Sequence, residues 1–181
     1  SIVLNEHFVE TGEIKDQTDL QGTIRFAWDS TYLYFFAEVQ DDSLFLIRSK
    51  GEIWRDDLLE LFFDPDADGM FWNRPSDFQL GFRVDPRLPE VKTWSWFQGG
   101  RDPSLTKDVI AKSYVTGNGY RIEGAIKWSY LKMTPQPGLL INMTPAIHDI
   151  DQDQTEAKLT WFYRNEKEEG RFQLGQMELT N

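Results

Sequence analysis

The residues best placed to do chemistry lie in one stretch of the chain, residues 54–65. Alternate side chains of a strand point to opposite faces of a sheet, so one face of this stretch is apolar and the other carries Glu60, with Trp54 at its start. An indole stacks on the C–H face of a sugar, and a carboxylate accepts protons from its hydroxyls. The pattern therefore indicates a sugar site, although an ordinary exposed glutamate satisfies it equally well. The apolar face is expected in the core and consists of Leu59, Leu61 and Phe63.

Further side chains are expected beside Glu60. Residues 77–85 also alternate, and their polar face carries Gln79 and Arg83. Arginine offers a fixed fork of donors that suits vicinal hydroxyls. Trp161, in a later predicted strand, is a candidate second wall. The alternative is a surface salt bridge between Glu60 and Arg83, with both indoles in the core.

Acidic residues cluster on predicted loops at 41–42, 64–68 and 149–153. Closely spaced aspartates suit calcium, which takes roughly six to eight oxygen ligands. No cluster matches an EF-hand loop, and aspartate also simply initiates turns. The residues proposed as calcium ligands are Asp41, Asp42, Asp149, Asp151 and Asp153.

Composition excludes several classes of protein. The chain has 181 residues, is 40% apolar and contains 7 Trp, 13 Phe and 6 Tyr, so it can build one sizeable core. Its net charge of −11 argues against binding to nucleic acid or to anionic membranes. The absence of cysteine excludes disulfides and thiolate sites. No apolar run approaches the ~18 residues of a membrane helix, so membrane insertion is not expected.

Short alternating segments separated by turn residues predict about ten strands and little helix. This spacing is typical of an all-β fold, a two-sheet antiparallel β-sandwich of jelly-roll type. We expect residues 1–181 to form a single domain that belongs to a larger protein. Pro145 predicts an edge or a bulge in its strand. The predicted strands are residues 23–28, 32–39, 54–64, 77–85, 91–97, 109–115, 119–128, 139–147, 157–163 and 172–179.

The order of these motifs, from about Thr23 to Leu179, resembles family 9 carbohydrate-binding modules and their DOMON-like relatives. That resemblance implies a β-sandwich with structural calcium, in which two tryptophans sandwich a sugar and charged side chains grip its hydroxyls. Trp54 and Glu60 match the motif in type and spacing, and Trp161 matches the second tryptophan. Arg83, Lys158 and Gln79 are further matches. The segments that carry the resemblance are residues 32–42, 54–65, 78–80, 119–128, 137–138 and 158–161.

The resemblance also implies a function. Such a module binds an oligo- or polysaccharide, or the end of its chain, without catalysis. It is joined covalently to a catalytic domain in a secreted or cell-surface bacterial enzyme that degrades polysaccharides. The chain is short at its N-terminus relative to the family, where members often carry an additional strand.

The sequence leaves two other functions open, haem binding and glycoside hydrolysis. Related sandwiches hold haem for electron transfer, and Met143 and His148 are the candidate ligands here. A glycoside hydrolase would need a second carboxylate beside Glu60, and Glu38 and Glu123 are the candidates.

Overall fold

The fold was analysed in a computed structural model, which describes residues 1–46, 53–71, 76–84, 91–93, 108–151, 154–161, 163–166 and 171–181. Within these residues the chain is almost entirely β-strand, arranged in two antiparallel sheets. The described helices are short, and none of them is long and apolar enough to cross a membrane. They are η1 (Glu6–Phe8), η2 (Ile53–Arg55) and α1 (Trp128–Leu131).

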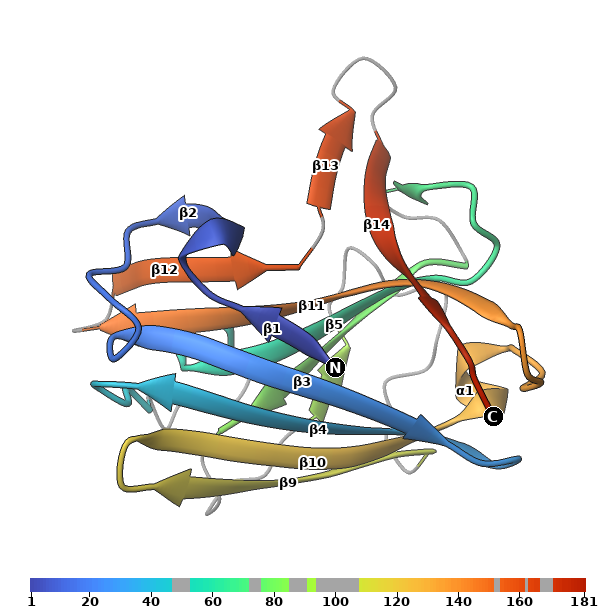
Figure 1. The fold of residues 1–181 in the computed structure, drawn as a ribbon, viewed down its shortest axis with the longest axis horizontal. Helices are drawn as coiled ribbons and strands as arrows, with labels where there is room; N and C mark the ends of the chain where they lie inside the picture. The colour runs from blue at the N-terminus through green and yellow to red at the C-terminus, as the bar shows by residue number, and fades with distance from the viewer. Residues whose placement is uncertain are drawn as a thin grey trace.

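The smaller sheet has five strands in the order β1-β3-β4-β10-β9. Figure 1 shows them running across the molecule, with β1 above and β9 below. The strand bounds are β1 (Ile2–Leu4), β3 (Leu20–Trp28), β4 (Tyr32–Asp41), β9 (Val109–Thr116) and β10 (Gly119–Lys127).

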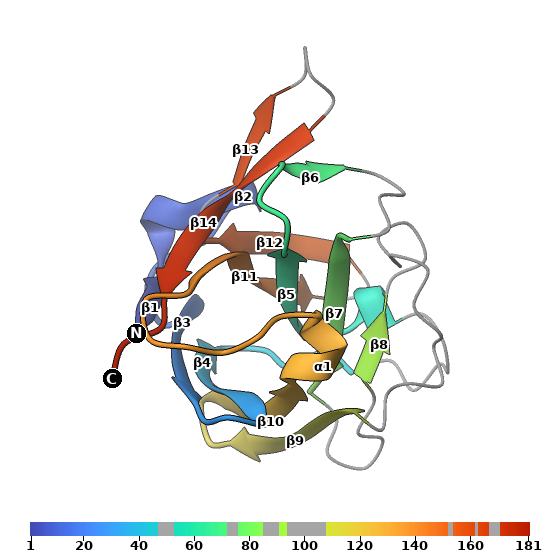
Figure 2. The same ribbon diagram turned by 90° about the vertical axis from the view of Figure 1, so that its right-hand side faces the viewer.

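The larger sheet follows the order β13-β14-β11-β5-β7-β8, with β12 paired to β11 and β2, and β6 paired to β14. Figure 2 shows β11, β5 and β7 on one side of the sandwich and β3, β4 and β10 on the other. The bounds are β2 (Val9–Gly12), β5 (Leu58–Asp64), β6 (Met70–Phe71), β7 (Phe78–Arg83), β8 (Val91–Thr93), β11 (Leu140–Asp151), β12 (Gln154–Thr160), β13 (Tyr163–Glu166) and β14 (Arg171–Glu178).

The core lies between the sheets and is built by the period-two alternation of the sequence. The inward residues of β5 and β7 are fully or almost fully buried in one apolar cluster with those of β3, β4, β10 and β11. The rings of Phe63 and Phe78, on neighbouring strands, stack with centroids 5.0 Å apart. Each such side chain contributes about 1.5–3 kcal/mol through burial. The prediction that Leu59, Leu61 and Phe63 belong to the core is confirmed.

The predicted two-sheet β-sandwich is confirmed, and the strands that the sequence did not predict are short. β1, β2, β6 and β13 have two to four residues each. So few residues give little alternation to recognise. Residues 94–97 of the strand predicted at residues 91–97 lie outside the described part of the chain.

Pro145 does not lie at a sheet edge. Along one of its two sides, β11 pairs first with β14, as far as residue 143, and then with β12, beginning at residue 146. Pro145 lies in the gap between these two partner strands. Its carbonyl accepts a hydrogen bond from the backbone N–H of Trp161 on that side, at 3.1 Å. Because no ladder bond is required there, the missing N–H of proline costs nothing. The bulge in β11 falls later, between Asp149 and Ile150.

The β9–β10 hairpin offers a stability test. Gly119 has a φ of +137°, and a Cβ there would collide with the backbone carbonyl of Val39, whereas a Cβ at Gly117 would meet nothing within 4 Å. We expect Gly119→Ala to destabilise the fold by about 1–3 kcal/mol, because both strain and backbone overlap oppose it. Gly117→Ala, the matched control, is expected to stay within about 1 kcal/mol of the parent. Thermal unfolding measures both, and equal effects would contradict this account of the hairpin.

Candidate functional site

A row of polar side chains crosses the outer face of the larger sheet, on the side away from the core. The register places Glu60 of β5 opposite Ala146 of β11, and His148 of β11 opposite Lys158 of β12. Gln79 of β7 lies opposite Phe62, next along the same face of β5. Because directly paired residues of neighbouring strands share a face, these side chains converge on Glu60.

The carboxylate of Glu60 is the centre of this row. Gln79 donates from Nε2 to Oε1 at 2.5 Å. His148 Nε2 lies 2.6 Å from Oε2, and Lys158 Nζ lies 3.8 Å from the same oxygen. Glu60 is only 2% exposed, and a buried carboxylate must be paired to avoid a large desolvation penalty. These three neighbours provide that pairing.

Lys158 extends the row to the sheet edge. Its ammonium lies 3.2 Å from Glu10 Oε2 of β2 and 5.3 Å from the centroid of the Phe62 ring. Thr160 donates to the same oxygen of Glu10 at 2.6 Å. The side chains of His148 and Lys158 are 15% and 17% exposed, so they carry the row out to solvent.

Arg83 has a different partner from the one proposed from the sequence. Its Nε lies 2.8 Å from Oδ2 of Asp56, and the two side chains are 1% and 0% exposed. The sequence-based alternative was a surface salt bridge between Arg83 and Glu60. In the structure Arg83 pairs with Asp56 instead, and the pair is buried. This buried ion pair lies beneath the outer face of the larger sheet. Removing either partner would leave an uncompensated buried charge and destabilise that face.

The two tryptophans are described to different extents. The backbone of Trp54 lies in η2, and its side chain is outside the described part of the structure. Trp161 directly follows β12 and is half-buried against the core cluster. A Cβ added to Gly175 of β14 would lie 2.5 Å from the Trp161 ring. The indole therefore packs closely on that glycine.

The structure adds His148 to the site, a residue that the sequence singled out only as a haem ligand. Met143 is completely buried in the core, whereas His148 lies on the outer face beside Glu60. Two residues on opposite faces of one strand cannot hold the same haem iron. The alternation of inward and outward side chains along β11 was the signal that could have placed His148 on the outer face, where Glu60 lies.

The carboxylates considered as partners of Glu60 in a hydrolase lie elsewhere. Glu38 of β4 pairs with Arg121 of β10, with 2.6 Å between Oε1 and Nη2. Glu123 of β10 accepts a hydrogen bond from Tyr114 at 3.0 Å. Both belong to the outer face of the smaller sheet, across the core from Glu60, so neither can act with it on one glycosidic bond.

A cluster of buried aspartates joins the two sheets. Carboxylate oxygens of Asp41, Asp57 and Asp149 lie within 4.8 Å of one another, and all three residues are buried. Asp41 ends β4, Asp57 precedes β5 and Asp149 belongs to β11. Asp57 accepts hydrogen bonds from the backbone N–H groups of Phe45 at 2.6 Å and Ile150 at 2.9 Å. Three carboxylates this close repel one another unless they bind protons or a cation.

The pKa values of this cluster reflect burial first and the repulsion between the carboxylates second. Burial, with the neighbouring charge of Asp41, raises the pKa of Asp57 from 3.8 to about 9. Burial also raises the pKa of Asp41 to about 6, with Asp151 adding to the effect. Below these carboxylates Tyr120 is completely buried, and burial raises the pKa of its phenol. Within the described residues, Asp41 Oδ2 and the Tyr120 hydroxyl have no hydrogen-bond partner. The unsatisfied carboxylate oxygen of Asp41 can serve as a ligand for a divalent cation.

The residues proposed as metal ligands are only partly in this cluster. Asp41 and Asp149 belong to it, and Asp57, which the sequence analysis did not select, is the third member. Asp151 lies close enough to raise the pKa of Asp41. Asp42 is exposed and outside the cluster, and Asp153 lies outside the described residues.

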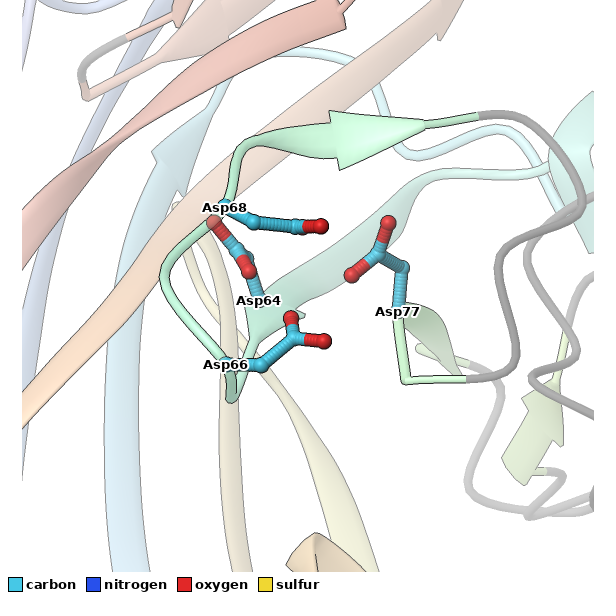
Figure 3. Close-up of side chains that lie close together, drawn as sticks. All are labelled: Asp64, Asp66, Asp68 and Asp77. Carbon is cyan, nitrogen blue, oxygen red and sulfur yellow. The ribbon is translucent and has the colours of Figure 1, made fainter.

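A second acidic cluster surrounds the turn after β5. Figure 3 shows the carboxylates of Asp64, Asp66, Asp68 and Asp77 facing a common space. One oxygen from each lies within 4.8 Å of the others. Asp64 and Asp77 are buried, at 1% and 0% exposure. Burial raises the pKa of Asp64, whose Oδ2 accepts from the backbone N–H of Gly69 at 2.9 Å. The sequence indicated the turn residues, and the pairing of β5 with β7 brings Asp77 to them.

Comparison with known proteins identifies the family. The family described as "Carbohydrate family 9 binding domain-like" matches residues 3–181. This chain belongs to that family. The matched residues include the polar row around Glu60 and both aspartate clusters.

Curated relatives of this family 9 domain are endo-1,4-beta-xylanases A. The enzyme of Thermotoga maritima is 28% identical over 129 residues, which is 71% of this chain. That of Thermotoga neapolitana is 24% identical over 131 residues. The chain spans 11% of the length of each of these relatives.

Solved structures share the fold of this family 9 domain. A family 9 carbohydrate-binding module from Caldicellulosiruptor kristjanssonii in complex with cellotriose superposes with a TM-score of 0.71 at 19% identity, covering 100% of this chain and 90% of that one. One from the same organism in complex with glucose gives a TM-score of 0.71 at 17% identity, covering 99% and 85%.

The buried aspartates predict an unusual pH dependence for the family 9 domain without metal. Asp57 and Asp41 keep their protons in the folded state at pH values where the unfolded chain has lost them. With chelator present, stability should therefore fall as the pH rises from about 4 to about 9, with a slope of at most about 1.4 kcal/mol per pH unit for each proton. Thermal unfolding across this range measures the trend. Asp57→Asn should flatten it, and a melting temperature in chelator that rises with pH would contradict the assignment.

Proposed function

We propose that this chain is a non-catalytic carbohydrate-binding module that takes a neutral oligosaccharide, or the end of a polysaccharide chain, at the polar row around Glu60. The observation that carries the proposal is the convergence of Gln79, His148 and Lys158 on one buried carboxylate. Family membership supports it, as do the cellotriose and glucose bound to proteins of the same fold.

The chemistry of the row suits hydroxyl groups. Ionised Glu60 only accepts, Lys158 only donates, and His148 and Gln79 do both, so together they can match both ends of each sugar hydroxyl. The neighbours of Glu60 already hold its carboxylate in one orientation. A preorganised acceptor loses little freedom when the sugar binds, and this increases affinity.

Trp54 and Trp161 are proposed as the walls that stack on the sugar rings, and Arg83 as a further donor. Trp161 is half-buried, so part of its indole faces solvent. Arg83 is held in place by its ion pair with Asp56, which fixes the position of its guanidinium.

Calcium is proposed as a structural cation at the cluster of Asp41, Asp57 and Asp149. Carboxylate oxygens are the ligands that this hard cation prefers. When bound, it would neutralise the repulsion within the cluster and tie β4 of one sheet to β11 of the other. The cluster around Asp64 and Asp77 has the same donor chemistry and is proposed as a second site.

The surrounding protein is also inferred. The curated relatives are xylanases that are much longer than this chain. We infer that the module is linked to a catalytic domain that degrades polysaccharides, and that the whole protein is secreted or held at the cell surface. No nucleic acid or membrane insertion is involved in this proposal.

Glu60→Gln tests the sugar site. We expect cellotriose affinity, measured by isothermal titration calorimetry, to fall by about tenfold or more, since a charge-assisted hydrogen bond is worth about 1.5–3 kcal/mol. Glu178→Gln makes the same change at an exposed position of β14 and should leave affinity unaltered. Equal affinities in the parent and the Glu60→Gln variant would refute the site.

Calcium addition to chelator-treated protein tests the metal proposal. We expect the melting temperature to rise, because at a hundredfold excess over the dissociation constant a ligand of the native state adds about 2.7 kcal/mol. Asp57→Asn should reduce the calcium-dependent shift, and Asp42→Asn, which changes an exposed aspartate outside the cluster, should keep it. A parent protein that neither binds calcium in calorimetry nor gains stability from it would refute the proposal.

A further inference from the structure

The outer face of the smaller sheet contains a groove that the Glu60 site does not use. The groove has a volume of about 430 Å³, which is within the range of ligand pockets. Figure 1 shows the strands that carry it, β3, β4, β10 and β9, side by side. Within its lining, Ala27 of β3 and Ala125 of β10 lie directly on either side of Tyr34 of β4. The two small alanine side chains leave space on both sides of the tyrosine ring.

The groove exposes apolar side chains on the outer face of the smaller sheet. Tyr34 is 38% exposed and Ile110 is 55% exposed, and both line the groove. Tyr34 and Phe36 are two positions apart on β4, so their rings lie on the same face. Phe36 is half-buried, with the guanidinium of Arg25 6.0 Å from its ring centroid. A contiguous apolar patch of this kind is a candidate binding surface.

A polar groove of about 280 Å³ lies alongside the aromatic one. Phe36 lines the first groove and Glu38 the second, and these are successive outward positions of β4. Arg25 and Thr23 of β3 are divided between the grooves in the same way. From residue 21 to residue 27 of β3, at about 3.3 Å per residue, the combined surface extends for roughly 20 Å.

The charges of this surface are balanced. Arg121 pairs with Glu38 at 2.6 Å, and Gln21 donates to Gln40 at 2.8 Å. Lys112 and Glu123 are directly opposite each other on β9 and β10. Because these charges are paired, the surface has no electrostatic field of a single sign that would attract a highly charged polymer. A second copy of this chain would bring another net charge of −11, which opposes self-association.

We infer that this surface is a second carbohydrate site, which binds the interior of an uncharged polysaccharide chain. Its aromatic half matches the C–H faces of sugar rings, and its amides and ion pairs match their hydroxyls. Its length suits several successive sugars rather than one. The choice of a glycan as the occupant rests on the proposed function. Because the Glu60 row lies on the opposite outer face, a single module would contact two segments of a polymer.

The experiment compares a polymer with a short oligosaccharide. Hydroxyethyl cellulose and xylan are tested by affinity electrophoresis, and cellotriose by calorimetry. We expect the double variant Tyr34→Ala/Phe36→Ala to lose about tenfold or more in polymer affinity and to keep its affinity for cellotriose. Ala125→Gln, which fills the groove without removing a ring, should do the same. Val115→Ala is the control, an exposed apolar residue of the same sheet outside the lining of both grooves.

The outcomes separate this inference from the proposed function. If groove variants that retain the parent circular dichroism spectrum bind polymer like the parent, the second site is refuted and the Glu60 site stands. The second site is also refuted if they lose cellotriose and polymer in parallel, or if the parent forms a dimer in sedimentation that Tyr34→Ala disrupts. Polymer binding that survives in Glu60→Gln while cellotriose binding is lost supports two sites. A parent that binds no glycan at all refutes the proposed function and this inference together.

Discussion

The desolvation of carboxylates is the constraint on which this structure depends. Glu60, Asp41, Asp56, Asp57 and Asp64 are nearly or fully buried, and an isolated buried carboxylate is very unfavourable. Each of them is compensated in a different way: Glu60 by polar neighbours, Asp56 by Arg83, and the aspartate clusters by protons or a cation. The positions of the polar side chains in the sandwich follow from these requirements, whereas the apolar core follows from alternation alone.

The strand β11 contributes residues both to the polar row around Glu60 and to the aspartate cluster between the sheets. One face of this strand supplies the core with Ile141, Met143 and Ile147, and the other places His148 beside Glu60. The strand changes partner from β14 to β12 around Pro145, which brings Lys158 into the row. Its bulge at Asp149 coincides with the aspartate cluster between the sheets. The candidate sugar site and the candidate cation site are therefore built on the same strand, and a distortion of one would reach the other through a few residues of backbone.

The two outer faces of the sandwich differ in chemistry. The face of the larger sheet is a buried hydrogen-bonded row centred on one carboxylate, which suits close contact with a few hydroxyls. The face of the smaller sheet is a long shallow surface with exposed aromatic rings and paired charges, which suits an extended ligand. A β-sandwich makes such a division possible, because the core separates the outward residues of one sheet from those of the other.

The sequence by itself determined the alternation, and with it the strands, the core face of β5 and the β-sandwich, because these depend on neighbours two residues apart. It also selected Glu60 and Gln79, whose polar positions within apolar strands are visible locally, and the family resemblance added Lys158. Only the tertiary structure decided which polar groups meet. The strand register brought His148 to Glu60, gave Arg83 to Asp56 and completed the aspartate clusters with Asp57 and Asp77. Those pairings join residues far apart in the chain, and no local pattern encodes which strands become neighbours.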